Sequence, residues 1–209
     1  MCRVRIENGV VVGTSGGKYE LRNPIARYLL AGFDRALGDL VRVVSPRRIL
    51  EVGCGEGHVT RLLWEWTSAK IHATDISETV IKEAQAYCPQ SERLSFEVVD
   101  IRNLKPLSPR PDLVVCCEVL EHLEDPIEGL RCLQRQQSQW YLLSVPREPL
   151  WRALNMLRGA YLRDFGNSPG HLQHWNRKAF LRLLQREGFM PLVHKSPVPW
   201  TIALCRGLP

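Results

Sequence analysis

Three glycines at alternate positions constrain this chain more than any other feature of its sequence: Gly53, Gly55 and Gly57. They follow an apolar run over residues 48–52, which predicts a short buried strand. Apolar residues then recur at helical spacing from Val59 onward. Glycine permits a sharp turn and the close approach of a ligand, and the next helix directs free N–H groups toward that ligand. The stretch therefore predicts a strand, a ligand-binding turn and a helix, with an ordinary glycine-rich turn as the alternative.

The spacing of this turn separates two kinds of nucleotide site. A dinucleotide-binding turn reads G-x-G-x-x-G, and the chain matches only its first two glycines because residue 58 is histidine. This mismatch disfavours a nicotinamide-dependent dehydrogenase. The run E-V-G-C-G-E-G at residues 51–57 resembles instead the first motif of the class I S-adenosylmethionine-dependent methyltransferases.

The resemblance implies a cofactor site along this loop. In that family the turn packs against the methionine part of the cofactor, and the acidic residue before it helps to hold the amino group. Glu51 is the acidic residue in this chain, and the implied loop residues are Gly53, Cys54, Gly55 and Gly57.

Acidic residues also end the next two predicted strands, residues 70–75 and 94–99. Asp75 follows Gly53 by roughly twenty residues, the separation expected of a carboxylate that accepts both hydroxyls of a ribose. Its neighbour Ile76 belongs to the same predicted cofactor wall. The resemblance implies that Asp100 meets the adenine amino group and that Ile101 packs on the ring. Either aspartate can alternatively be a helix or turn cap.

The remaining pattern predicts an α/β fold: a doubly wound, Rossmann-like, seven-stranded sheet with a terminal antiparallel strand pair. Two further strands at residues 112–117 and 140–145 complete the parallel part, and the connection between 189–194 and 201–205 is too short for a crossover helix. One methyltransferase domain then spans 1–209. Its parts are a loosely structured lead-in and a helix (1–46), the cofactor half (47–146), a lid insertion (147–175), and a final helix with the strand pair (176–209). Tyr19 either leans over the cofactor or is a plain surface tyrosine.

The chemistry is expected just after the fourth strand. If Glu118 begins a helical turn, Glu121 and His122 share its face at the edge where ligands bind. In the first hypothesis Glu118 touches the cofactor and His122 is the general base for an acceptor hydroxyl. In the second the cluster binds a divalent metal, with a further ligand from His171 or His174. In the third these are polar residues of a surface turn.

This second pattern resembles two groups within the family. One is the quinone-pathway O-methyltransferases. The other is the small-RNA terminal 2′-O-methyltransferases, which hold a metal with two glutamates and two histidines. The metal set implied here is Glu118, Glu121, His122 and His171.

The insertion over residues 147–175 is longer than a bare connection. Apolar and aromatic residues, Trp151 and Tyr161 among them, recur at helical spacing with arginines between them. We expect an aromatic lid over the acceptor, with Trp151, Tyr161, His171 and His174 as candidate substrate-binding residues. An amphipathic helix packed on the sheet, or an interfacial helix at a membrane or lipid substrate, is the alternative.

Charge and cysteine content limit the partners and the compartment. The 209 residues carry a net charge of +6 that is spread out, so the sequence predicts no dedicated nucleic-acid arm. The seven cysteines form no C-x-x-C motif, which favours free thiols in a cytoplasmic protein. No apolar run reaches the length of a transmembrane segment.

These observations lead to one main hypothesis and two alternatives. The main one is an S-adenosylmethionine-dependent methyltransferase that O-methylates a small-molecule acceptor. The alternatives are a metal-dependent RNA 2′-O-methyltransferase and a non-catalytic cofactor-binding partner subunit. The sequence leaves the acceptor, the methylated atom, the metal requirement and the oligomeric state open.

Overall fold

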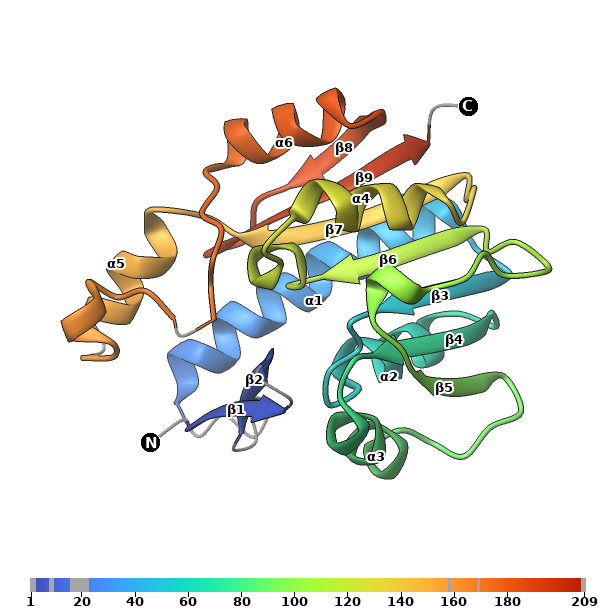
Figure 1. Ribbon diagram of the computed structural model, residues 1–209, viewed down its shortest axis with the longest axis horizontal. Coiled ribbons are helices and arrows are strands. Elements are labelled where there is room, and N and C mark those ends of the chain that lie inside the picture. Colours follow the sequence, from blue (N-terminus) through green and yellow to red (C-terminus); the bar gives the residue numbers. More distant parts are fainter. Residues whose placement is uncertain (1–2, 8–9, 16–22, 158, 169, 208–209) are drawn as a thin grey trace.

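The computed structural model describes residues 3–7, 10–15, 23–157, 159–168 and 170–207. Its centre is a twisted sheet with helices on both faces (Figure 1). The seven strands of this sheet are β3 (Arg48–Val52), β4 (Lys70–Asp75), β5 (Leu94–Val98), β6 (Leu113–Cys117), β7 (Trp140–Pro146), β8 (Phe189–Lys195) and β9 (Trp200–Gly207).

The strand order is β5-β4-β3-β6-β7-β9-β8, which confirms the predicted doubly wound sheet. Strands β3 to β7 run parallel, and β9 is antiparallel to both β7 and β8. The chain proceeds outward from β3 to β5 and then returns to the other side of β3 with β6. Such a switch point opens a crevice at the carboxyl ends of β3 and β6, where ligands bind in this class of sheet.

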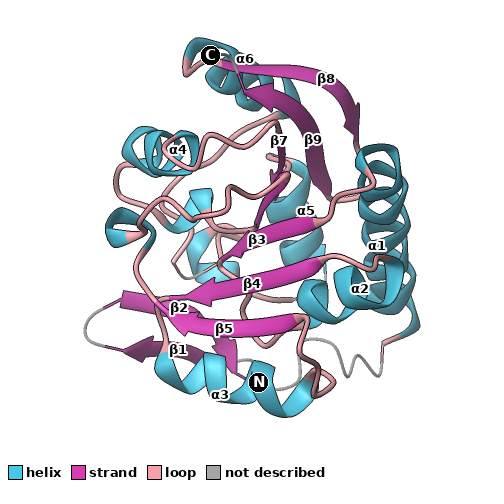
Figure 2. Ribbon diagram, turned by 90° about the vertical axis from the view of Figure 1, so that its right-hand side faces the viewer, coloured by secondary structure: helices cyan, strands magenta, loops and turns pink. Residues whose placement is uncertain are grey.

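Helices cover both faces because the strands are apolar on both sides. The helices are α1 (Pro24–Val44), α2 (His58–Trp66), α3 (Glu78–Tyr87), α4 (Pro126–Gln134), α5 (Leu150–Leu157) and α6 (Arg177–Arg186), with short 3₁₀ turns η1 (Ile101–Asn103), η2 (Leu120–His122) and η3 (Leu162–Asp164). Figure 2 shows α1 and α2 on one face of the sheet and α4 on the other.

Alternate residues of the central strands β3, β6, β7 and β9 enter different cores. Ile49 packs with Leu37 and Leu63 in the core under α1 and α2. Its neighbour Leu50 packs with Leu130 in the opposite core, under α4 and α6. The two-residue period of a strand therefore fixes the sheet between two apolar layers, and its polar loops are left at the edges.

The amino-terminal segment differs from the expected loosely structured lead-in. Strands β1 (Arg3–Glu7) and β2 (Val10–Ser15) form an antiparallel hairpin separate from the main sheet. The β-branched residues of this segment favour such pairing. Tyr19 lies outside the described residues. Within the described ranges, no helix combines the length and apolar character needed to cross a membrane.

Candidate active site

A cavity of about 640 Å³ lies at the carboxyl edge of the sheet, at the switch point between β3 and β6. It gathers residues from the ends of four neighbouring strands. The sequence-predicted residues that line it are Glu51, Gly53, Cys54, Gly55, Asp75, Ile76, Asp100, Ile101, Glu118 and His122. Residues far apart in the chain thus meet in one chamber because parallel strands end at the same edge.

The three glycines of the loop are needed for two different structural reasons, close packing and open space. Gly53 has φ +75°, and a Cβ there would lie 2.2 Å from Val119 Cγ2. Gly55 has φ +56° and open space where its Cβ would be. Gly57 does not line the cavity; a Cβ there would lie 2.9 Å from Cys88 Sγ, so this glycine lets α2 pack closely against α3. Two glycines thus shape the loop by close packing, and Gly55 leaves room for a ligand.

Glu51 is a buried carboxylate in the cavity wall. It is 3% exposed, and Oε2 has no hydrogen-bond partner among the described residues. Burial, reinforced by the nearby Asp75 carboxylate, raises the pKa of Glu51 to about 8. A cationic amino group placed beside this oxygen would supply the missing partner and favour the charged form.

This pKa predicts the pH dependence of a Glu51→Gln variant. Between the ordinary value of 4.5 and about 8, the folded protein binds more protons than the unfolded chain, so stability falls as the pH rises through that window. Without cofactor, Glu51→Gln should therefore melt at a higher temperature than the wild type at pH 8, and the difference should shrink toward pH 4.5. Thermal unfolding across this range tests it, with the exposed Glu97→Gln as control. Equal pH dependence in all three proteins would contradict the prediction.

Asp75 braces the loop while it faces the cavity. Its Oδ2 accepts from the backbone N–H of Gly55 at 3.0 Å, and its Oδ1 accepts from that of Ser77 at 3.1 Å. The cap of α3 is Ser77, whose hydroxyl oxygen accepts from Val80 N–H at 3.1 Å. Asp75 is therefore not the helix cap. Each carboxylate oxygen can accept a second hydrogen bond, so the position remains suited to a ribose diol.

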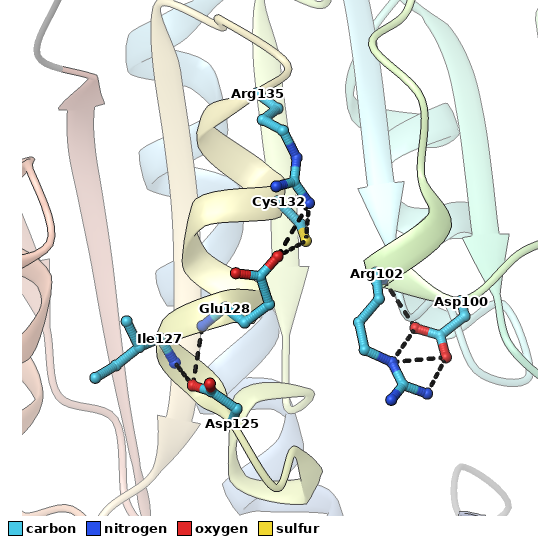
Figure 3. Close-up of polar contacts among 7 residues, drawn as sticks. All are labelled: Asp100, Arg102, Asp125, Ile127, Glu128, Cys132 and Arg135. Atoms are coloured by element: carbon cyan, nitrogen blue, oxygen red, sulfur yellow. Dashed lines mark hydrogen bonds and ion pairs between the residues drawn. The ribbon is translucent and has the colours of Figure 1, made fainter.

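Asp100 forms a close ion pair with Arg102, and both residues line the cavity. Figure 3 shows the Arg102 side chain turned back onto Asp100, away from Asp125 at the start of α4. The hydrogen bonds from Arg102 lower the pKa of the Asp100 carboxyl. Asp100 also caps η1, so it combines the turn-cap role with its place in the cavity wall.

The segment after β6 differs from the helical turn expected at Glu118. The 3₁₀ turn η2 begins only at Leu120, and Glu118 has φ +59° in the left-handed region. Its Oε1 accepts from Ser144 Oγ and its Oε2 from Trp200 Nε1, each at 2.9 Å. These two donors turn the carboxylate toward β7 and β9, so Glu118 does not share a helical face with Glu121 and His122.

A second group of polar side chains forms beside this turn from Glu121, His122 and His171. One potential ligand atom of each lies within 4.8 Å of the others. Glu121 is 1% exposed and His171 is 9% exposed. The backbone oxygen of Glu121 accepts from Leu172 and Gln173 N–H, at 2.8 Å and 3.0 Å, which holds the distant loop against η2. Of the four residues in the predicted metal set, the structure groups all but Glu118.

His122 is fixed in one orientation. Its Nδ1 is 2.9 Å from the carbonyl oxygen of Gly170. A carbonyl can only accept, so Nδ1 carries a proton, and in the neutral form of the ring the lone pair lies on Nε2. The His122 and His171 rings meet edge to face at 4.9 Å. This tautomer suits Nε2 for accepting a proton or binding a metal.

The predicted lid residues have different positions. The Trp151 ring stacks on His171 at 5.7 Å, and its Nε1 donates to Ser168 Oγ at 2.8 Å. None of the four candidates lines the cavity: Trp151, Tyr161, His171 and His174 are all absent from its lining, and His174 Nε2 is instead 2.7 Å from Asn167 Oδ1. On the outside, Leu157 and Phe165 are 84% and 72% exposed. The segment therefore packs one aromatic side chain beside the site and presents apolar residues to solvent.

Several lining residues did not emerge from sequence reasoning, Phe33, Trp200 and His58 among them. Phe33 of α1 and Trp200 of β9 line the cavity and pack together with ring centroids 5.1 Å apart. His58 also lines it, and its Nε2 lies 2.9 Å from Asp34 Oδ1 on α1. Two sequence features could have indicated these residues: the helical apolar spacing that includes Phe33, and the position of Trp200 at the start of the last strand. Both features are weak evidence for a site, because they are equally typical of core residues.

Fold and cavity together define a class of protein, the S-adenosylmethionine-dependent methyltransferases with a Rossmann-like, seven-stranded sheet. The chain belongs to the family described as "Methyltransferase domain", whose profile matches residues 19–194. It is therefore an S-adenosylmethionine-dependent methyltransferase, which decides against the dehydrogenase and the non-catalytic subunit.

Particular relatives agree with this family. The chain is 28% identical, over 71% of its length and 69% of the relative, to a ubiquinone biosynthesis O-methyltransferase of Xanthomonas campestris pv. campestris. It shares its fold with magnesium protoporphyrin IX methyltransferase of Synechocystis PCC 6803, solved with bound S-adenosylhomocysteine (TM-score 0.68, 19% identity, 90% of this chain and 89% of that one). An N-methyltransferase of Bradyrhizobium japonicum WM9 has the same fold (TM-score 0.66, 17% identity, 87% and 98% covered).

Proposed function

We propose that this methyltransferase transfers the methyl group to a hydroxyl oxygen of a small-molecule acceptor, with His122 as the general base. The observation that carries the proposal is the position of His122 in the cavity wall with Nδ1 tied to Gly170. A hydroxyl is a weak nucleophile until its proton is removed, and imidazole accepts protons near neutral pH. The name of the Xanthomonas relative, a ubiquinone biosynthesis O-methyltransferase, supports oxygen as the methylated atom.

The cavity residues fit the cofactor. Glu51, with its unpartnered buried oxygen, would bind the amino group, and Asp75 would bind the ribose hydroxyls. Asp100 and Ile101 would flank the adenine, and Gly55 leaves the open space in which the loop can meet the ligand. When bound, S-adenosylmethionine supplies an activated methyl group. The chain's own residues therefore need mainly to align the acceptor and to accept its proton.

The group Glu121, His122 and His171 favours a second candidate, a metal-dependent form of the same O-methylation. A carboxylate and two imidazoles are typical ligands of zinc and other divalent transition metals. When bound there, a metal would lower the pKa of an acceptor hydroxyl, and Nε2 of His122 would be a ligand rather than a base. The three residues of this group support only the binding of a metal. They give no evidence for an RNA acceptor, which therefore stays a prediction from the sequence.

Substitution of His122 by asparagine tests the first candidate. Asparagine can still donate to Gly170 but accepts no proton, so turnover should fall by about 100-fold or more, the usual contribution of general base catalysis. S-adenosylhomocysteine affinity, measured by calorimetry, should stay close to the wild-type value. His72→Asn, at a partly buried histidine of β4 outside the cavity lining, is the matched control. The acceptor for this assay is first found by screening hydroxyl compounds with the wild type. If His122→Asn then turns it over at the wild-type rate, His122 is not the base.

Calorimetric titration with Mn²⁺ and with Zn²⁺ separates the two candidates. The metal-dependent form predicts binding that is lost in Glu121→Gln and His171→Asn but kept in Glu124→Gln at the cavity mouth. It also predicts that a chelator abolishes turnover. If the folded wild type binds neither ion and a chelator does not change turnover, the metal-dependent form is refuted. The first candidate, with His122 as a general base and no metal, then remains.

A further inference from the structure

Trp200 lies where the last strand pair meets the cavity. It is the first residue of β9 and pairs in register with Pro146, the last residue of β7. Because β9 runs antiparallel to β7, its beginning falls at the edge where the parallel strands end. Trp200 consequently lines the cavity, although it comes from the strand pair that follows the cofactor half.

The indole N–H of Trp200 holds one oxygen of a carboxylate. It donates to Glu118 Oε2 at 2.9 Å, and Ser144 Oγ of β7 donates to Oε1 at 2.9 Å. Donors from two different strands therefore bind the two oxygens of one side chain. Hydrogen bonds of this kind stabilise the charged carboxylate and restrict its direction.

The backbone of Glu118 also needs support. Its φ of +59° lies in the left-handed region, which residues other than glycine adopt infrequently. Such conformations persist where surrounding contacts determine them. The next residue, Val119, packs directly against Gly53, so this strained turn touches the cofactor loop. The backbone turn that carries Glu118 therefore lies against that loop.

The Trp200 ring joins two further elements to this carboxylate. It packs against Phe33 of α1 with centroids 5.1 Å apart and against Trp151 of α5 at 5.8 Å. Phe33 lines the cavity, and Trp151 stacks on His171 in the acceptor half. The Trp200 side chain therefore contacts α1, α5 and the carboxylate of Glu118.

We propose that Trp200 is a positioning residue of the methyl-transfer site, which acts through Glu118. Its indole N–H, together with the Ser144 hydroxyl, fixes the Glu118 carboxylate in the cavity wall where the cofactor binds. Its ring, packed between Phe33 and Trp151, keeps that N–H in place. This role deepens the proposed function and rests on it, because it assumes that Glu118 faces the bound cofactor.

Trp200→Phe isolates the hydrogen bond because phenylalanine keeps a ring against Phe33 and Trp151 but has no N–H. S-adenosylhomocysteine affinity, measured by calorimetry, should fall about 5-fold, less than for a hydrogen bond lost directly to a charged group, because the N–H acts on the ligand only through Glu118. Ser144→Ala removes the other donor and should weaken binding similarly. Trp140→Phe is the matched control, since Trp140 lies at the opposite end of β7 and outside the cavity.

A double-mutant cycle distinguishes positioning from a merely structural role. In a Glu118→Ala background, Trp200→Phe should weaken binding less than about 2-fold further, because the acceptor of its N–H is already absent. Wild-type affinity in both Trp200→Phe and Ser144→Ala, or a full additional loss in the Glu118→Ala background, would overturn the proposal. Failure of the folded wild type to bind S-adenosylhomocysteine would instead overturn the cofactor site on which it rests.

Discussion

Replacing Gly55 with alanine is expected to weaken cofactor binding strongly and to leave the protein folded. A Cβ at Gly55 meets nothing within 4 Å, so it would occupy open space in the cavity instead of displacing protein atoms. The positive φ of +56° adds strain of about 1–2 kcal/mol, which a folded domain can tolerate. A methyl group between the loop and its ligand removes the close approach, so we expect S-adenosylhomocysteine affinity to fall by roughly 100-fold or more.

Gly53→Ala gives the opposite pattern and serves as the matched comparison. Its Cβ would lie 2.2 Å from Val119 Cγ2 on the neighbouring turn, at a φ of +75°. Overpacking and backbone strain together should lower the free energy of unfolding by about 3 kcal/mol or more. Denaturant unfolding and calorimetry on both variants separate the two effects.

Gly32→Ala provides the control for this pair. Gly32 lies within α1, where a Cβ meets nothing within 4 Å, so alanine should preserve binding and raise helix stability slightly. Wild-type affinity in Gly55→Ala would show that the cofactor does not lie against this loop.

Asp75→Asn is expected to cause a comparable loss of cofactor affinity. Hydrogen bonds from ligand hydroxyls to a charged group contribute about 1.5–3 kcal/mol each, and a carboxylate can accept from both ribose hydroxyls. Asparagine offers one oxygen and turns an N–H₂ group toward donors such as Gly55 N–H, which Asp75 now binds at 3.0 Å. Calorimetry should therefore show S-adenosylhomocysteine binding weakened by roughly 100-fold.

An analogue of S-adenosylhomocysteine that lacks the two ribose hydroxyls sharpens this prediction. The wild type should bind the analogue far more weakly than the natural ligand, whereas Asp75→Asn should discriminate little between them. Glu97→Gln, at an exposed carboxylate on β5, is the control and should retain wild-type discrimination. Equal discrimination by Asp75→Asn and the wild type would place the ribose away from Asp75.

The cofactor half of the site could be predicted from the sequence because each part is local. A glycine turn follows β3, an acidic residue ends β4, and another acidic residue follows β5 within a few positions. Once apolar patterning predicts a parallel sheet, the ends of its strands must meet at one edge. Glu51, Asp75 and Asp100 therefore come together in the cavity as the spacing predicted.

Local sequence was a poorer guide where one segment meets another. The left-handed Glu118 interrupts the expected helical turn, since donors on β7 and β9 hold its carboxylate. Gly57 matches the cofactor motif, yet its absent side chain makes room for Cys88 on α3. Both outcomes depend on neighbours that lie 26 or more residues away in the chain.

The sequence by itself determined the fold class, the family and the cofactor, because strand patterning and the glycine loop depend on neighbouring residues. Only the tertiary structure decided which distant side chains complete the site. It brings His171 to Glu121 and His122 through a loop held on the backbone of η2, and it brings Trp200 to Glu118 through an antiparallel strand. These contacts arise from packing between elements, which no periodicity within one segment encodes.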